Sequence, residues 1–184
     1  MLEFKLMPFP TLRTERLVLR QCCLADDEQM HNLRSNDQVM QYINRPRSEN
    51  PAMARKLIEE IQAGLEKDEN VTWAITLPEN DVLIGTILLF HFDKQNHRGE
   101  IGYMLHENFH RQGYMQEAIV KVIDYGFSVL NLHSIEANIN PGNVASRGIL
   151  EQNGFVQEAY FKEDYYWEGK FLDTVILSLI NPGH

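Results

Sequence analysis

One stretch of the chain decides the fold, and it reads Glu100-Ile101-Gly102-Tyr103-Met104-Leu105-His106-Glu107-Asn108-Phe109-His110-Arg111-Gln112-Gly113-Tyr114-Met115-Gln116-Glu117-Ala118. Its first part contains the β-formers Ile101 and Tyr103 and predicts a strand. From Met115 the apolar residues recur at helical spacing, which predicts a long helix. The backbone N–H groups that open a helix are unpaired and favour a bound phosphate. A single glycine before a helix is more often an ordinary turn, so both interpretations stay open.

The segments on either side of this stretch predict a single mixed α/β domain that spans residues 1–184, with its core at 11–180. We expect seven strands, at residues 13–21, 71–77, 82–92, 100–105, 133–140, 155–160 and 172–180. We expect helices at residues 26–34, 36–42, 51–65, 112–130 and 143–152, and a long hairpin loop at 161–171. Short turns join most neighbouring strands and predict antiparallel pairs, whereas the helical crossover between 100–105 and 133–140 predicts a parallel pair.

Composition narrows the class of protein. The formal net charge is −9, which argues against a nucleic-acid-binding surface and is compatible with a cationic partner. No apolar run reaches the roughly 20 residues that span a bilayer, and residues 1–10 lack the pattern of a secretory signal. Cys22 and Cys23 are adjacent and poorly placed to bridge each other, so we expect a reducing, cytoplasmic compartment. The histidines do not share ligand spacing on one element, so we expect no metal site.

Several motifs occur in a characteristic order: Thr14–Arg20, Gly99–Leu105, Gln112–Ala118, Asn143–Ser146 and Leu150–Phe155. With these motifs the chain resembles the GCN5-related N-acetyltransferase (GNAT) superfamily. Within that superfamily it is most similar to the branch of the ribosomal-protein N-terminal acetyltransferases RimJ and RimL. The resemblance implies a mostly antiparallel sheet that splays between its fourth and fifth strands, with helices on both faces.

The chain departs from the family pattern at a few positions. The family's coenzyme loop, Gln/Arg-x-x-Gly-x-Gly/Ala, corresponds here to His110, Gly113 and Met115, so only the central glycine is kept. Arg111 stands where the branch often has a second glycine. Leu150 stands where many members of the superfamily carry a tyrosine general acid, so that mechanism does not carry over.

The resemblance implies direct transfer of an acetyl group from acetyl-CoA to a primary amine, without a metal or a covalent enzyme intermediate. It implies that backbone groups of Tyr103, Met104 and Leu105 bind the pantetheine arm. It also implies that the coenzyme is held by a further set of residues: His110, Arg111, Gln112, Gly113, Tyr114, Met115, Asn143 and Ser146. The alternative interpretation of Asn143 is a plain helix N-cap.

Two residues are candidates for the catalytic groups. Glu100 is a candidate general base that acts through water, or else a solvent-facing carboxylate paired with Arg98 or a lysine. Glu163, Asp164 and water are rivals for the role of the base. In a RimL-like protein Ser146 would protonate the thiolate, whereas its position alone predicts an ordinary exposed serine.

The acceptor side carries no readable specificity code. An aromatic cluster either walls the acceptor site or packs in a homodimer interface, and it consists of Tyr160, Phe161, Tyr165, Tyr166 and Trp167. The acceptor would be a protein N-terminal amine, such as that of a ribosomal protein, or a small amine. The acidity of the chain favours a cationic acceptor such as a basic tail or a polyamine. A module that binds acyl-CoA without turnover and a structural protein with no coenzyme site are the alternatives.

Overall fold

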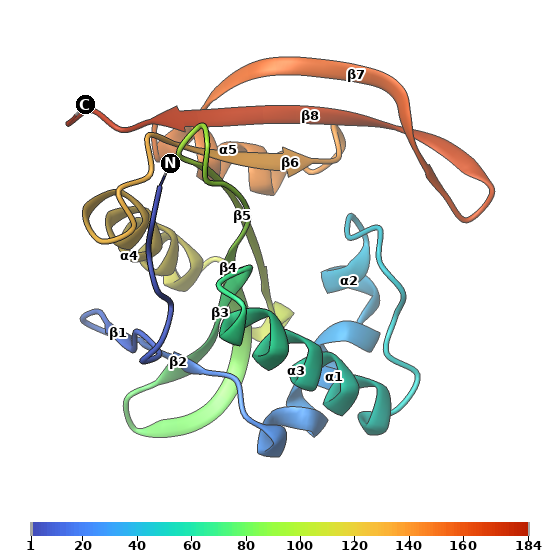
Figure 1. Ribbon diagram of the computed structural model, residues 1–184. Coiled ribbons are helices and arrows are strands. Elements are labelled where there is room, and N and C mark those ends of the chain that lie inside the picture. Colours follow the sequence, from blue (N-terminus) through green and yellow to red (C-terminus); the bar gives the residue numbers. More distant parts are fainter. Residues whose placement is uncertain (1, 184) are drawn as a thin grey trace.

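The computed structural model describes residues 2–183, which form a twisted mixed sheet with helices against it (Figure 1). The strands are β1 (Leu12–Arg13), β2 (Val18–Gln21), β3 (Asn70–Leu77), β4 (Asn80–Asp93), β5 (Arg98–Leu105), β6 (Ser134–Ile139), β7 (Val156–Trp167) and β8 (Lys170–Ile180). The helices are α1 (Asp27–Ser35), α2 (Asp37–Met40), α3 (Pro51–Glu66), α4 (Tyr114–Ser128) and α5 (Val144–Gln152).

The eight strands lie in the order β1-β2-β3-β4-β5-β6-β8-β7. Parallel pairing joins β5 to β6, as the helical crossover predicts, and the other neighbours are antiparallel. The parallel ladder contains only three pairs, Arg98 with Ser134, Gly99 with Ile135 and Glu100 with Glu136. Beyond them the two strands separate, so the expected splay between these strands is confirmed.

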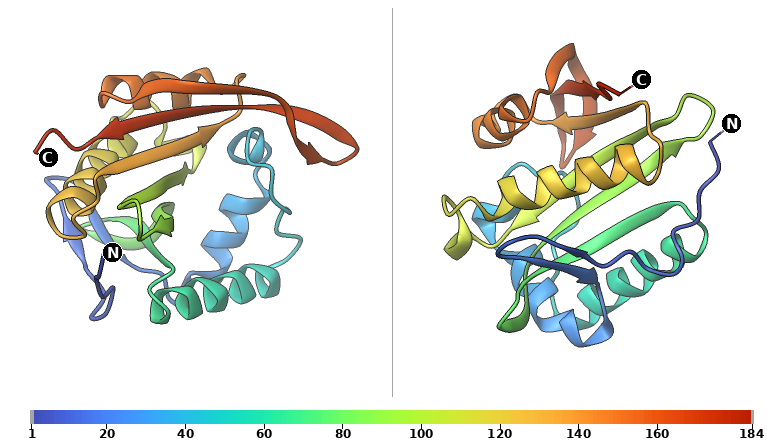
Figure 2. Two further views of the ribbon diagram at one scale, coloured as in Figure 1. Left: turned by 45° about the horizontal axis from the view of Figure 1, so that its top comes forward. Right: turned by 90° about the vertical axis from the view of Figure 1, so that its left-hand side faces the viewer.

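Helices cover both faces of the sheet, as expected (Figure 2). On one face α1 and α3 bury Met30, Leu33 and Ile58 against β3 and β4. On the other face α4 buries Ile119 and Val122 in the larger of the two apolar clusters. The start of α3 follows its sequence, because Asn50 Oδ1 accepts a hydrogen bond from Met53 N at 3.0 Å and Pro51 takes the first helical position.

Two details of the predicted sheet are wrong. The strand expected at 13–21 is broken by a turn in which Leu17 N donates to Thr14 Oγ1 at 3.0 Å, so the sheet has eight strands rather than seven. The loop expected at 161–171 is instead the far half of a long β7–β8 hairpin. Its tip is a two-residue turn at Glu168 and Gly169, whose φ angles of 46° and 83° suit a tight hairpin.

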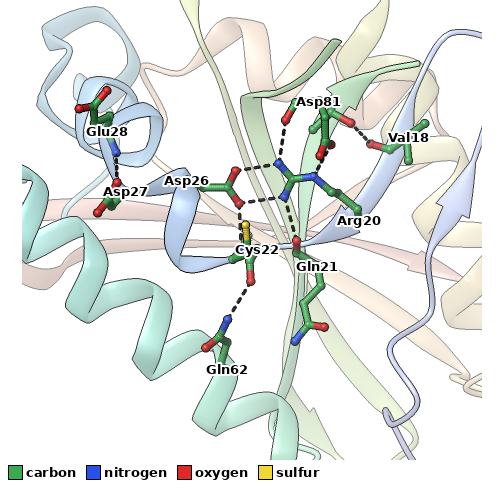
Figure 3. A network of polar contacts seen from close by, with 11 residues as sticks. Val18, Arg20, Gln21, Cys22, Asp26, Asp27, Glu28, Gln62 and Asp81 are labelled. Carbon is green, nitrogen blue, oxygen red and sulfur yellow. Dashed lines mark hydrogen bonds and ion pairs between the residues drawn. The ribbon is translucent and has the colours of Figure 1, made fainter. Parts of the chain in front are cut away.

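The first helical segment is anchored to the sheet by Arg20 of β2 (Figure 3). Its guanidinium donates to both carboxylate oxygens of Asp26, at 2.8 and 2.7 Å, and to the carbonyl oxygen of Asp81 at 2.9 Å. The Asp26 side chain is only 6% exposed. Burial alone would raise the pKa of Asp26, but the hydrogen bonds from Arg20 and from the Cys23 amide outweigh it and lower that pKa.

We therefore expect Asp26→Asn to lower the free energy of unfolding by about 3 kcal/mol, because the largely buried Arg20 guanidinium would lose its two-oxygen partner and keep only the exposed carboxylate of Asp81, which contacts Arg20 Nε. The folded-state pKa of Asp26 is lowered, so its contribution is present above the unfolded pKa of about 3.9 and is lost as the pH falls through the folded value. Urea unfolding between neutral and acidic pH measures both effects. Asp81→Asn is the control, since the Asp81 side chain is 78% exposed and its loss should cost at most about 1 kcal/mol. Equal losses of unfolding free energy for the two variants would contradict the conclusion that Asp26 is the main partner of Arg20.

Candidate functional site

A cavity of about 610 Å³ lies where β5 and β6 separate. Residues of five regions line it: Leu88, Phe90 and His91 of β4; Glu100–Met104 of β5; Ala137–Ile139 of β6 with Asn140, Asn143 and Ser146 beyond it; Arg34 and Tyr42–Arg45 near α1 and α2; and Asp164, Tyr165, Asp173 and Thr174 of the β7–β8 hairpin. The cavity thus brings together segments that are far apart in the sequence, and it contains both predicted catalytic residues.

The edge of β5 that faces the cavity has no strand partner after Glu100, within the residues that the structure describes. Unpaired backbone groups seek partners, and an extended ligand can supply them as an added strand would. Tyr103 and Met104 line the cavity along this edge. The Leu105 carbonyl already accepts a hydrogen bond from His110 Nε2 at 2.8 Å. The free edge therefore fits an elongated ligand such as a pantetheine arm at Tyr103 and Met104 rather than at the Leu105 carbonyl.

The turn before α4 has the backbone that its sequence suggested. Gly113 is the N-cap residue with φ of 81°, and no side chain caps the helix. Arg111, at the position where the branch often has glycine, also lies in the left-handed region with φ of 58°. The first amides of α4 are thus without a side-chain partner, and such amides suit a phosphate group. The predicted residues of this turn fit the pyrophosphate of a coenzyme.

An ion pair that sequence reasoning missed holds this turn in place. Arg16 Nε contacts Glu117 Oε2 at 2.7 Å, and Arg16 Nη1 donates to the carbonyl oxygen of Gln112 at 2.9 Å. The Arg16 amide and the Thr14 hydroxyl also donate to Glu117. Burial would raise the pKa of Glu117, but these hydrogen bonds prevail and lower it. The β1–β2 turn therefore braces the start of α4.

Ser146 lies deep in the cavity, bonded to a tyrosine. The residue is 8% exposed, so the expectation of an ordinary exposed serine is wrong. Its Oγ lies 2.8 Å from the Tyr103 hydroxyl, and burial raises the pKa of Tyr103 to about 12. Asn143 Oδ1 accepts from Ser146 N at 3.1 Å, so Asn143 caps α5 and also lines the cavity. The two hydroxyl groups form a chain that opens into the site.

Glu100 lines the same cavity from β5. Its side chain is 12% exposed, and Oε2 lies 2.9 Å from His91 Nδ1. The alternative partner Arg98 instead contacts Glu136 at 2.7 Å. Glu100 is therefore a largely sheltered carboxylate beside a histidine, rather than a carboxylate paired with Arg98.

The rival acids are placed differently. Asp164 lines the cavity from the hairpin. Glu163 lies at a bulge with φ of 54°, where its amide donates to Asp173 Oδ1 at 2.8 Å, and its residue does not line the cavity.

One member of the predicted aromatic cluster lines the cavity. The Tyr165 hydroxyl donates to the Asn44 carbonyl oxygen at 3.0 Å and so ties the hairpin to the loop after α2. Tyr160, Phe161 and Tyr166 are 52%, 47% and 61% exposed on the outside of the hairpin. The cluster is thus divided between the cavity and the surface.

Residues 2–183 contain neither a candidate metal cluster nor a candidate membrane-spanning helix. No group of three or more His, Cys, Asp or Glu side chains is placed to hold a metal ion in that part of the chain. None of the helices described there is both long enough and apolar enough to cross a membrane. The absence of a metal stays a prediction.

The splayed sheet and its cavity define an acyltransferase of the N-acetyltransferase type, and the comparisons with known proteins agree. The family described as "Acetyltransferase (GNAT) domain" matches residues 16–156, and the chain belongs to this family. "Uncharacterized N-acetyltransferase YoaA" of Bacillus subtilis is 34% identical over 174 residues, which cover 95% of this chain and 98% of that protein.

Two solved structures show how closely the fold agrees. An acetyltransferase (GNAT family) from Bacillus anthracis superposes with a TM-score of 0.82 at 26% identity, covering 93% of this chain and 98% of that one. RimL, the ribosomal L7/L12 alpha-N-protein acetyltransferase in complex with coenzyme A, superposes with a TM-score of 0.84 at 18% identity, covering 93% and 97%. The resemblance to the RimJ/RimL-like branch is confirmed with the help of a sequence relative, "Putative ribosomal N-acetyltransferase YdaF" of Bacillus subtilis, which is 34% identical over 98 residues that cover 53% of this chain and 54% of that protein.

Proposed function

We propose that this chain transfers an acetyl group from acetyl-CoA to a primary amine by direct attack of the amine on the thioester. The observation that carries the proposal is the single cavity where Glu100 and the Tyr103–Ser146 pair meet the unpaired edge of β5. That arrangement offers the three elements that the reaction needs: a base for the amine, a groove for the donor and a proton for the thiolate.

Donor binding is assigned to β5 and to the turn before α4. Backbone groups of Tyr103 and Met104 pair with the pantetheine arm, while the amides that follow Gly113 bind the pyrophosphate. Arg111 can neutralise its charge, and Asn143 contacts the arm from α5. His110 contributes by fixing the turn to the Leu105 carbonyl. The RimL structure named for its complex with coenzyme A supports this choice of donor.

Glu100 serves as the general base. An ammonium group must lose its proton before it can attack, and Glu100 takes that proton through a water molecule. Its side chain is sheltered in the cavity wall, and His91 at 2.9 Å fixes its orientation.

Ser146 protonates the departing thiolate. The Tyr103 hydroxyl remains protonated near neutral pH because burial raises its pKa to about 12. The two oxygens lie 2.8 Å apart and either can donate; with Tyr103 as the donor, the serine proton is free to point into the cavity. Ser146 gives that proton to the sulfur, Tyr103 replaces it on Ser146, and solvent restores Tyr103.

The proposal includes two classes of acceptor, a small amine and a protein N-terminus, and the names of two relatives illustrate them. One relative at 25% identity is the spermidine N(1)-acetyltransferase of Vibrio cholerae. Another, at 31% identity over 47% of this chain, is the ribosomal protein uS5-alanine N-acetyltransferase of Escherichia coli. A cytoplasmic location and a homodimer stay predictions, as does the absence of nucleic-acid and membrane partners.

The reaction itself is tested by release of free thiol from acetyl-CoA in the presence of peptides and small amines. Glu100→Gln should lower kcat at pH 7 by about 10² to 10⁴ because the base is lost, with the Kd of acetyl-CoA unchanged. Asp164→Asn is the matched comparison, since it removes the rival carboxylate and should change kcat by no more than about twofold. A large loss of kcat for Asp164→Asn, together with full turnover by Glu100→Gln, would assign the role of general base to Asp164. Binding of acetyl-CoA without turnover of any amine would favour the binding module instead.

The hydroxyl pair makes a second prediction. Ser146→Ala should lower kcat by about 10² and Tyr103→Phe by about tenfold. Because Tyr103 acts through Ser146, the double variant should be no slower than Ser146→Ala alone. Steady-state kinetics of the four proteins measures this coupling, and additive losses would show that the two hydroxyl groups act separately.

Gly113→Asp should raise the Kd of acetyl-CoA at least tenfold, about 1.4 kcal/mol, because a carboxylate would stand beside the bound pyrophosphate. Gly148→Asp is the control, since Gly148 lies on α5 with no atom within 4 Å of an added Cβ. Isothermal titration measures both. Unchanged affinity in a folded Gly113 variant would refute the assignment of the turn.

A further inference from the structure

Two arginines line the cavity on the side away from the donor turn. Arg34 comes from α1 and Arg45 from the loop that follows α2, and both belong to the cavity wall. Arg34 is half-buried and Arg45 is exposed. Neither residue belongs to a motif that carried the family resemblance.

The guanidinium groups of these two arginines have no carboxylate partner among residues 2–183. Other arginines of the same layer do have partners, since Arg47 pairs with Asp37 and Arg55 lies 3.2 Å from Asp27. Burial and the nearby charge of Arg45 lower the pKa of Arg34. The two like charges therefore line the cavity without a direct ion pair to a carboxylate of the described residues.

Hydrogen bonds to backbone carbonyls fix the Arg34 side chain and the loop that carries Arg45. Arg34 Nη2 donates to the Pro46 carbonyl oxygen at 2.8 Å, which leaves its other nitrogen atoms unpaired in the described part of the chain. The Tyr165 hydroxyl holds the Asn44 carbonyl, one residue before Arg45. Guanidinium groups suit a carboxylate or phosphate, which they can bind through several charge-assisted hydrogen bonds.

The same cavity also contains the carboxylates of Glu100, Asp164 and Asp173, with Asp164 and Asp173 on the hairpin. Asp173 is engaged by the Tyr160 hydroxyl and the Glu163 amide, while Glu100 is the proposed base. We propose that the acceptor is a primary amine that carries an anionic group, with the amine at Glu100 and the anion between Arg34 and Arg45. This inference rests on the proposed acetyl transfer and names the class of its acceptor.

A polycationic acceptor would be repelled by the same two arginines. An amine such as spermidine would bring further positive charge to the region that holds two unpaired guanidinium groups, and like charges in a partly dry site repel. We therefore infer that the wall formed by Arg34 and Arg45 selects against polyamines.

The test compares matched acceptors with and without an anion: 4-aminobutyrate with butylamine, phosphoethanolamine with ethanolamine, and the dipeptide amide Ala-Asp with Ala-Asn. We expect kcat/KM to be at least about tenfold higher for the anionic member of at least one pair, and spermidine to be poorer than that member. The pair that responds distinguishes a small carboxylate, a phosphate and a peptide. Equal values within every pair, or a preference for spermidine, would overturn the inference.

Variants connect the preference to the two arginines. The double variant Arg34→Gln/Arg45→Gln should bring the ratio of kcat/KM within the responding pair towards one, whereas Arg47→Gln should leave the ratio unchanged. Arg34→Lys keeps the charge and guards against a folding defect, so it should retain part of the preference, with the melting temperature of each variant as the check. A preference that survives in the folded double variant would overturn the assignment.

A binding measurement separates this inference from the proposed reaction. With coenzyme A present, N-acetyl-4-aminobutyrate should bind at least about tenfold more tightly than N-butylacetamide, and the double variant should abolish the difference. If no amine is acetylated but this difference holds, the anion site stands and the proposed reaction fails. If amines are acetylated without preference and the two products bind equally, the reaction stands and the anion site fails.

Discussion

The rest of the molecule depends on the point at which β5 and β6 stop pairing. At the closed end, Arg98 contacts Glu136 of β6 at 2.7 Å and donates to Ser178 of β8 at 3.0 Å, so three strands are fastened together. Just beyond it the ladder ends at Glu100. Buried backbone groups without partners are costly, and a sheet keeps such an edge only where something else can pair with it. The divergence thus makes both the cavity and the place for an extended ligand.

The same segment of chain provides both ends of this binding surface. The free edge of β5 leads through a short turn to the uncapped start of α4, and His110 ties the turn to the end of the strand through the Leu105 carbonyl. Arg16 and Glu117 fix that turn from the other side. A ligand that is elongated at one end and anionic at the other therefore meets a surface that is already in place, which reduces the ordering cost of binding.

The sequence predicts those features of the fold that depend on the local spacing of apolar residues. Leu17 and Leu19 alternate and are fully buried, and the helical spacing from Met115 places Ile119 and Val122 in the core. The β7–β8 hairpin escapes such reasoning because neither face of its tip is buried, and Tyr166 and Phe171 are more than half exposed. The contact between Tyr103 and Ser146 depends on how α5 packs against β5, and no spacing rule joins residues 43 positions apart. Gly113 allows its turn to be predicted from the sequence. The role of Arg16 depends on its contact with Glu117, which only the folded structure shows.

The net charge of the whole chain favours a cationic acceptor, whereas the two arginines of the cavity favour an anionic group. A net charge of −9 favours cations at long range, but salt screens such fields beyond about 8 Å at physiological ionic strength. In the proposed acceptor site, selection would take place inside the cavity that Arg34 and Arg45 line. Contact groups in that setting act far more strongly than a distant, screened excess of carboxylates. The net charge of the chain therefore bears on the first encounter with an acceptor, whereas in our proposal these two arginines select which amine stays bound.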